Sequence, residues 1–451
     1  MLHNSLKVIK LAKVSAVPLL KMDKKIRVVI TGIGPLASCG IGKNQFWQGL
    51  LEKKTGIKLE EYFIGDQLWD KFYLHKVENF DIARIGIEPY LLEQIKSWKK
   101  GEESTDLYFL LAAVKLAIDD AKLTFNRDNN DISCIITHEN PGLEQYFSKI
   151  IDLSFDALIN NKITKKDFAE RLHYGSIKSS FDLQTFMTLF HVTKTFGIHG
   201  YSLFLNNACA SGLYALENAA QIIKSGRSRT VIIAAADYPR IYKYLWFKEL
   251  KMYSPDGKIR PFARDANGFV FGDGGVGLVL ESLENAKKRK AIIYAEYLGG
   301  GFSQEGWKVT FPMSGGDFYQ KAVAEALAFS RVKIKEIDCV CAHGAANAII
   351  DRYEVKAITD IFGIKFKRPL ITTFKPYVGH NLGGSALLET AILLLCMENN
   401  ICLPVLNTET IEPKMQIDLV REKLEVKLST VLKTCCAFAG YNAAAVFKRI
   451  R

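Results

Sequence analysis

Apolar positions follow two alternating patterns along most of the chain. Short apolar runs predict buried strands, and apolar residues at helical spacing predict amphipathic helices between them. The predicted strands of the first half are 27–31, 134–137, 201–205 and 230–236, and the predicted helices are 106–121, 211–224 and, further along, 318–329. This alternation of strands and helices favours a layered α/β fold.

The pattern starts again after a basic stretch near residue 290. Predicted strands follow at 291–301, 338–344, 369–374 and 442–449, and predicted helices at 350–362 and 385–398. In each half a buried strand runs into a turn with a chemically active side chain, Cys209 in the first and His343 in the second, so we expect an internal duplication. The expected divisions are a loose extension at 1–24 and halves at 25–290 and 291–451.

The opening of the chain is basic and apolar, with no acidic residue before Asp23. It lacks arginine and a small-residue cleavage site, so a loose extension is the preferred interpretation over a targeting segment. The longest apolar run, 386–397, is too short to cross a bilayer and contains Glu389. The sequence therefore predicts no membrane span.

Two nucleotide-binding motifs are excluded. Gly272, Gly274 and Gly277 form a literal GxGxxG, but β-rich sequence follows them where a dinucleotide site needs a helix. The dipeptide Gly42-Lys43 is followed by Asn44, which breaks the Walker A pattern.

Composition and charge narrow the class of protein. The chain has 451 residues, of which 48% are hydrophobic, and is long enough to bury a large core. Its net charge of +12 favours an acidic partner, which charge alone leaves open between nucleic acid, an anionic membrane and an acidic carrier protein. Nine cysteines without a CxxC pair or a histidine at zinc-finger spacing predict a reduced cytoplasmic protein without structural metal.

One cysteine lies at a predicted strand-to-helix turn. The strand 201–205 is followed by "NNACASG", which contains Cys209, and then by the helix 211–224. The first amides of a helix carry the positive end of its dipole and favour a thiolate, which predicts a nucleophile. The alternative is a small buried apolar cysteine.

Three further stretches carry candidate chemistry. "AHGAANAIIDRYE" places His343 directly after an apolar strand, and "TFKPYVGHNLGG" places Lys375 and His380 around a strand-to-helix turn. "CCAFAGYNA" surrounds Phe438 with small residues. Each stretch alone also fits ordinary close packing.

Together and in this order, the stretches resemble the β-ketoacyl-ACP synthases, specifically the elongating ketosynthases of the thiolase superfamily, from about residue 25 to 451. The resemblance implies an α/β thiolase-like fold, whose duplicated halves form a five-layered αβαβα core. It implies a decarboxylative Claisen condensation in fatty-acid or polyketide-type biosynthesis, in which an acyl group held on Cys209 reacts with malonyl-ACP. The initiating enzymes of the superfamily have asparagine in place of the second histidine, so His380 favours the elongating class.

The resemblance also assigns six catalytic positions: Cys209, His343, His380, Lys375, Glu354 and Phe438. The cysteine accepts the acyl group, and the two histidines stabilise the enolate that forms from malonyl-ACP. The lysine supports the histidines, and Glu354 is the acid expected to pair with it. The phenylalanine is the gate, and its backbone N–H and that of Cys209 are expected to form the oxyanion hole.

Some positions depart from the family pattern. Ala345 and Asn347 replace two threonines that hold the pantetheine arm, and residues 261–263 read Pro-Phe-Ala where an acid is usual. Ala437 and Ala439 replace glycines of the gate, and "THENPG" at 137–142 stands where a glycine-rich turn borders the acyl pocket. Because of these departures, the identity of the acyl substrate and the ease with which the gate moves do not follow from the resemblance.

The resemblance implies no cofactor and no metal, because the phosphopantetheine arm of an acyl carrier protein carries the substrates. Asn347 and Thr310 are the residues expected to contact that arm. The expected partners are the carrier protein and a second copy of the chain or another ketosynthase-like chain, with no nucleic acid. Two alternatives remain open: a carrier-dependent acyltransferase that acts on an alcohol or amine, and a non-catalytic partner subunit of an active ketosynthase.

Overall fold

The computed structural model describes residues 26–98, 104–158, 162–313, 315–363 and 369–450. The predicted extension at 1–24 lies outside these residues. The structure confirms the α/β class and the duplication, because both halves repeat one sheet topology. The expected division between residues 290 and 291 falls between α9 (Leu283–Lys288) and β10 (Ala295–Gln304). That this division is a domain boundary stays a prediction.

The first half contributes five strands to the main sheet: β1 (Val28–Ala37), β5 (Ser133–Thr137), β6 (Ser202–Leu205), β7 (Thr230–Asp237) and β9 (Gly274–Ser282). Their order is β1-β9-β7-β5-β6. β5 runs parallel to β6 and β7, whereas β9 is antiparallel to β7 and β1. The short β2 (Gly40–Ile41) pairs with the end of β1.

The second half repeats this arrangement with β10 (Ala295–Gln304), β11 (Cys339–Cys341), β12 (Leu370–Thr372), β15 (Thr430–Cys436) and β16 (Tyr441–Lys448). Their order is β10-β16-β15-β11-β12, with parallel and antiparallel neighbours in the same places. β1 and β10, the first strands of the two halves, pair antiparallel and join the half-sheets.

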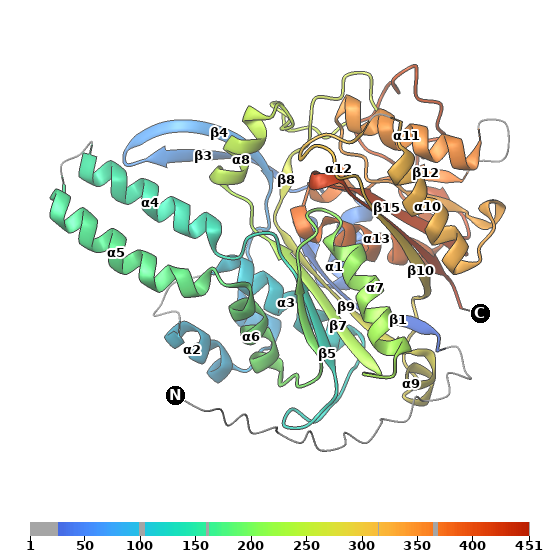
Figure 1. Cartoon of the computed structure of the whole chain (residues 1–451), viewed down its shortest axis with the longest axis horizontal. Helices are drawn as coiled ribbons and strands as arrows, with labels where there is room; N and C mark the ends of the chain where they lie inside the picture. Colours follow the sequence, from blue (N-terminus) through green and yellow to red (C-terminus); the bar gives the residue numbers. More distant parts are fainter. Residues whose placement is uncertain (1–25, 99–103, 159–161, 314, 364–368, 451) are drawn as a thin grey trace, which may run out of the picture.

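Helices cover both sides of each half-sheet (Figure 1). α3 (Thr105–Asp120) packs on the outer face of the first half-sheet, and α10 (Asp317–Ser330) packs on that of the second, beside α11 (Ala348–Phe362). α7 (Ser211–Lys224) and α13 (Ser385–Asn399) contact each other between the half-sheets. This order gives the five expected layers.

Glycines of β1 and β9 let α3 lie directly on the sheet. A Cβ at Gly277 would lie 2.3 Å from the backbone oxygen of Ala113, and one at Gly34 would lie 2.3 Å from the backbone nitrogen of Ala117. The glycine-rich stretch that contains Gly277 therefore serves close helix packing, in agreement with the rejection of a dinucleotide site.

The most apolar helix of the described chain belongs to the core. The window Leu382–Asn399 is long and apolar enough to cross a membrane, but 89% of it is buried inside the fold. α13 is buried on all sides from Ser385 to Met397, which explains why its apolar residues show no single face.

Other elements surround these layers, and the sequence patterns did not predict most of them. The helices are α1 (Lys43–Leu51), α2 (Pro89–Trp98), α4 (Leu143–Leu158), α5 (Lys165–Asp182), α6 (Thr185–Phe196), α8 (Ile241–Glu249) and α12 (Lys375–Val378). The minor strands are β3 (Ile57–Ile64), β4 (Gln67–His75), β8 (Phe271–Gly272), β13 (Ile401–Cys402) and β14 (Leu424–Glu425).

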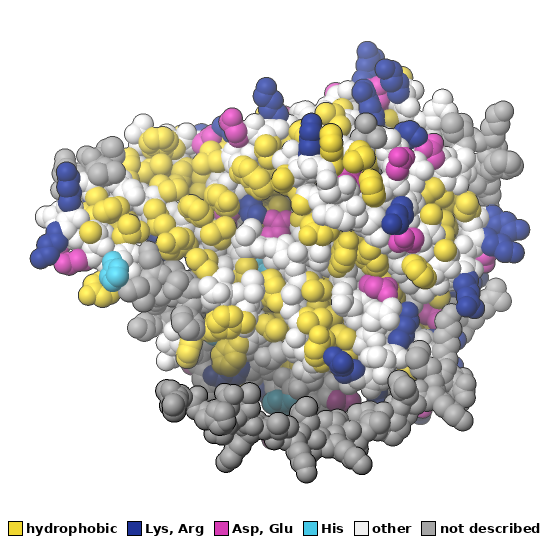
Figure 2. All heavy atoms as spheres, viewed as in Figure 1, with side chains coloured by type: hydrophobic (Ala, Val, Ile, Leu, Met, Phe, Trp, Pro, Cys, Tyr) yellow, Lys and Arg dark blue, Asp and Glu magenta, His cyan; other side chains and the backbone are white. Residues whose placement is uncertain are grey.

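The end of the molecule that carries β3, β4, α4 and α5 projects from the layered core (Figure 1). Apolar side chains gather over this end (Figure 2). Among those on the β3–β4 hairpin, Leu59, Phe63 and Trp69 are exposed. A surface of this kind is typical of an interaction site.

The contact between α7 and α13 leaves no room for a side chain at Gly212. A Cβ there would lie 2.6 Å from the backbone nitrogen of Leu387 and 2.7 Å from its Cβ. We expect Gly212→Ala to lower the free energy of unfolding by about 1–3 kcal/mol through overpacking, measured by urea denaturation. The control is Gly175→Ala on α5, where the new Cβ meets nothing within 4 Å. Equal effects of the two changes would contradict the close contact.

Candidate active site

Cys209 lies at the turn between β6 and α7, as predicted, and faces His380 from the other half of the chain. The preceding Ala208 has a φ of 50°, in the left-handed region that alanine rarely adopts. Ser211 holds the turn, since its Oγ accepts from the N–H of Asn207 at 2.7 Å and donates to the carbonyl of Ala208 at 2.6 Å. The sulfur of Cys209 lies 3.3 Å from Nε2 of His380.

Backbone contacts fix the proton of His380. The N–H of Leu382 donates to Nδ1 at 2.9 Å, and the hydroxyl of Ser385 lies 2.9 Å from the same atom. A nitrogen that accepts from a backbone N–H carries no proton, so the neutral ring holds its proton on Nε2. His380 therefore directs an N–H donor at the sulfur of Cys209.

His343 follows β11, and its Nδ1 also faces a donor, the ammonium of Lys375. The ammonium of Lys375 lies 3.3 Å from Nδ1 of His343 and donates to its carbonyl oxygen at 2.8 Å. An ammonium only donates, so Nδ1 accepts and Nε2 carries the proton. The rings of His343 and His380 lie 5.8 Å apart, and both line the cavity in front of Cys209. The predicted support of the histidines by Lys375 thus exists for His343.

The expected pairing of Glu354 with Lys375 is wrong. The partner of Lys375 is Glu389 on α13, at 2.6 Å, and the other oxygen of Glu389 lies 2.6 Å from the ammonium of Lys433. All three side chains are at most 1% exposed. The pairing differs because α13 brings Glu389 directly beside the lysine, whereas α11 directs Glu354 at the backbone.

Glu354 instead shapes the turn that carries His343. Its carboxylate accepts from the N–H groups of His343 and Gly344, at 2.7 and 2.8 Å, and from the hydroxyl of Tyr319. These bonds hold the backbone after β11 in one conformation. Glu354 is thus a positioning residue in this geometry.

Burial changes the protonation of the site. It raises the pKa of Cys209 well above its ordinary value, with Glu139 and Cys435 adding to the rise and Lys375 opposing it. Desolvation thus disfavours the thiolate at a helix start whose dipole favours it. Burial, together with the charge of Lys375, lowers the pKa of His343 and of His380 well below the ordinary value, so both rings stay neutral.

Phe438 lies at the mouth of the cavity in front of Cys209. Its ring stacks on Phe247 at 5.2 Å and meets Trp246 edge-on at 5.9 Å. The next residue, Ala439, has a φ of 58° and donates its N–H to the carbonyl of Val309 at 2.6 Å. The cavity that Phe438 lines has a volume of about 30 Å³. The gating role of Phe438 stays a prediction. The oxyanion hole stays a prediction.

The two expected contacts to the pantetheine arm have different surroundings. Thr310 lines the outer side of the cavity, next to Val309 and Phe311. Asn347 caps α11, where its side-chain oxygen accepts from the N–H groups of Ile349 and Ile350 at 3.1 and 3.3 Å. The capping contact occupies the oxygen and leaves the amide NH₂ as the free donor of the side chain. A contact of Asn347 with the arm stays a prediction.

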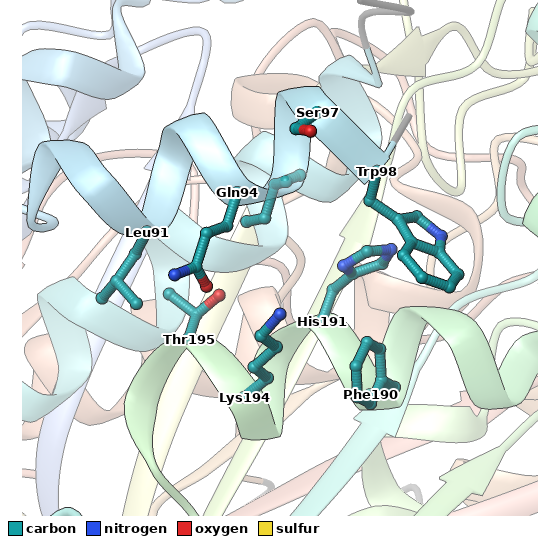
Figure 3. A pocket seen from close by; sticks show the side chains of 9 residues that line it. Leu91, Gln94, Ser97, Trp98, Phe190, His191, Lys194 and Thr195 are labelled. Carbon is teal, nitrogen blue, oxygen red and sulfur yellow. The ribbon is translucent and has the colours of Figure 1, made fainter. Parts of the chain in front are cut away.

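A larger pocket lies away from Cys209, between α2 and α6 (Figure 3). Its volume is about 500 Å³, and Trp98, Phe190, His191 and Lys194 are among the side chains that line it. None of the described residues that line it is a cysteine or an acid. Within the described ranges, no group of three histidine, cysteine or acidic side chains could hold a metal ion.

Sequence reasoning missed two residues of the charge cluster, Glu389 and Lys433. Both are charged positions inside apolar elements, Glu389 in α13 and Lys433 in β15. A charge inside a buried element needs a partner, which was the available signal. The sequence does not show that Glu389 pairs with both Lys375 and Lys433, because these residues come together only in the folded second half.

Known proteins are similar to this chain over almost its whole length. Residues 25–286 match the family model described as "Beta-ketoacyl synthase, N-terminal domain", and residues 294–409 match "Beta-ketoacyl synthase, C-terminal domain". The 3-oxoacyl-[acyl-carrier-protein] synthase 2 of Coxiella burnetii is 27% identical over 438 residues, which cover 95% of this chain and 100% of that protein. The putative polyketide beta-ketoacyl synthase 1 of Streptomyces halstedii is 28% identical, with 93% of this chain and 97% of that protein covered.

Solved structures share the fold. The ishigamide ketosynthase/chain length factor superposes with a TM-score of 0.82 at 24% identity, over 95% of this chain and 100% of that chain. A type II PKS ketosynthase, bound to the hexaketide in complex with its acyl-carrier protein, gives a TM-score of 0.78 at 24% identity, with 95% and 100% covered.

The neutral buried histidines predict a loss of stability in acid. In the unfolded chain their pKa returns to about 6.5, so below that pH the unfolded state binds protons that the folded state does not. The free energy of unfolding should fall as the pH decreases below about 6.5. We expect His380→Asn to make this fall shallower by up to about 1.4 kcal/mol per pH unit.

The measurement is urea denaturation at about pH 7.5 and about pH 5.5. His173→Asn is the control, because His173 is exposed on α5. A pH dependence that is unchanged by His380→Asn would contradict a buried neutral imidazole.

Proposed function

Because the chain belongs to the beta-ketoacyl synthase family and is a condensing acyltransferase of fatty-acid or polyketide biosynthesis, we propose that Cys209 carries the acyl group and that His343 and His380 activate malonyl-ACP. The observation that carries this proposal is the pair of neutral imidazoles, each with Nδ1 held by a donor and each lining the cavity of Cys209.

In the first step, the sulfur of Cys209 attacks the thioester carbonyl of an acyl carrier. A bond forms between the sulfur and the carbonyl carbon, and the bond from that carbon to the carrier sulfur breaks. The thiol proton ends on the departing carrier sulfur. The Nε2–H of His380 donates to the sulfur of Cys209, which lowers the cost of the thiolate in a site where burial raises it.

In the second step, malonyl-ACP loses CO₂ and its electron pair forms an enolate. The Nε2–H groups of His343 and His380 are donors suited to the thioester oxygen on which the negative charge develops. The enolate carbon then attacks the acyl carbonyl, and the sulfur of Cys209 leaves. Neutral donors suit this task because they need no proton transfer before the charge develops.

The partners follow from surface and charge. A net charge of +12 supports an acidic carrier protein, and a solved relative is described in complex with its acyl-carrier protein. The exposed apolar side chains of the β3–β4 hairpin support association with a second copy of this chain. A heterodimer is the alternative, since another relative is a ketosynthase/chain length factor pair. A cytoplasmic location completes the proposal.

The contact of Cys209 with His380 favours catalysis over a non-catalytic subunit, which has no need of a nucleophile beside a donor. A carrier-dependent acyltransferase needs the cysteine but no second donor for an enolate. The presence of both histidines at the cavity therefore supports condensation.

The test distinguishes the role of the Cys209 thiol in acyl transfer from the role of the histidines in decarboxylation. Cys209→Gln should abolish acyl transfer and condensation but still release CO₂ from malonyl-ACP, because its amide carbonyl takes the place of the acylated sulfur. Adding His380→Ala should lower this release by about a hundredfold, because one donor to the enolate is lost. CO₂ release and the appearance of acetyl-ACP by mass spectrometry are the measurements.

Cys134→Ala is the matched control, because Cys134 is a buried cysteine on β5 outside the cavity. This variant should load an acyl group and decarboxylate like the wild type. An inert Cys209→Gln variant beside a decarboxylating wild type, or acylation at another cysteine, would overturn the proposal.

A further inference from the structure

A buried ion pair lies on the inner side of the site. The ammonium of Lys243 on α8 lies 2.7 Å from the carboxylate of Glu139, and the two side chains are 6% and 12% exposed. Glu139 is close enough to Cys209 to raise the pKa of its thiol, and Lys243 is close enough to His380 to lower the pKa of its ring. None of the steps proposed above uses this pair.

Backbone contacts tie the pair to the reactive turns. The side-chain amide of Asn206, three residues before Cys209, donates to the carbonyl of Glu139 at 2.9 Å. A Cβ at Gly383, three residues after His380, would lie 3.4 Å from the side chain of Glu139. Glu139 therefore packs beside the turns that carry Cys209 and His380, and Lys243 is held there through its ion pair.

Two small cavities share the loop of His380 and the helix α8. The cavity of Cys209 is lined by His380 and by Phe247 of α8. A second cavity, of about 20 Å³, is lined by Leu382 and by Lys243, one helical turn before Phe247. His380 and Leu382 belong to one loop, so this loop and one face of α8 contribute to the walls of both cavities.

The outer side of the first cavity leads to solvent, because Val309 is 63% exposed. An acyl group that arrives from this side extends inward from Cys209. The space of about 30 Å³ holds only a few atoms, and a longer chain must displace the wall or the charged pair behind it. An alkyl chain offers neither charge nor hydrogen bond to replace the contacts that the pair would lose.

We propose that the Glu139–Lys243 pair ends the acyl site, so that the enzyme loads short acyl groups in preference to long alkyl chains. This inference rests on the proposed role of Cys209 as acyl acceptor. Asn140 reinforces the barrier, because its side-chain oxygen, with the amide turned to satisfy both neighbours, accepts from Lys243 at 2.9 Å. The pair is thus a specificity-determining contact.

The experiment compares the loading rates of acetyl-, butyryl- and octanoyl-pantetheine thioesters on the intact protein by mass spectrometry. The wild type should load acetyl at least about tenfold faster than octanoyl. In the double variant Glu139→Gln/Lys243→Met, which keeps the side-chain size but removes both charges, the octanoyl-to-acetyl ratio should rise at least about tenfold. Removing both partners avoids leaving one charge of the pair buried without the other.

The matched control is Glu281→Gln/Arg289→Met, which removes another buried ion pair at the far end of β9. Its ratio should equal that of the wild type. Equal loading of acetyl and octanoyl by the wild type, an unchanged ratio in the first double variant, or an equal change in the control would overturn the barrier while leaving Cys209 as acyl acceptor. Failure of every thioester to load would overturn the proposed function and this inference with it.

Discussion

The site depends on the close approach of α7 and α13 between the half-sheets. Cys209 precedes α7 and His380 precedes α13, so the distance between the reactive atoms is set by how closely the two helices pack. Gly212 allows this approach, because any side chain there would overlap the backbone of Leu387. The 3.3 Å contact of sulfur and imidazole is therefore a result of core packing, and the apolar surroundings that produce it also desolvate the thiol.

Burial also constrains the charged residues beside the histidines, because a buried charge needs a partner. Lys375 and Lys433 share the single carboxylate of Glu389, each at 2.6 Å, with all three side chains buried. Such a group is stable only because each charge has a partner. The excess positive charge next to the rings disfavours their protonation, so the cluster that holds His343 in place also keeps it a neutral donor.

The sequence predicted elements whose signal is local and missed those that depend on distant partners. The helix 211–224 was predicted with the observed ends, because its apolar face repeats at helical spacing. β1 extends to Ala37 rather than residue 31, because pairing with β9 overrides the weak strand preference of its glycines and proline. The positions of Cys209 and both histidines could be predicted from motifs, whereas the acid beside Lys375 could not. Glu354 and Glu389 are distinguished only by which helix packs against the lysine.

The repeated topology gives the molecule an approximate internal twofold axis. Equivalent elements meet across it, β1 against β10 and α7 against α13, as the same surface meets itself in a symmetric dimer. Under this symmetry the turn of Cys209 corresponds to the turn of His380, and His138 after β5 corresponds to His343 after β11. The two halves therefore bring different side chains to one cavity, Cys209 from the first and His343 and His380 from the second, so neither half by itself contains the whole site.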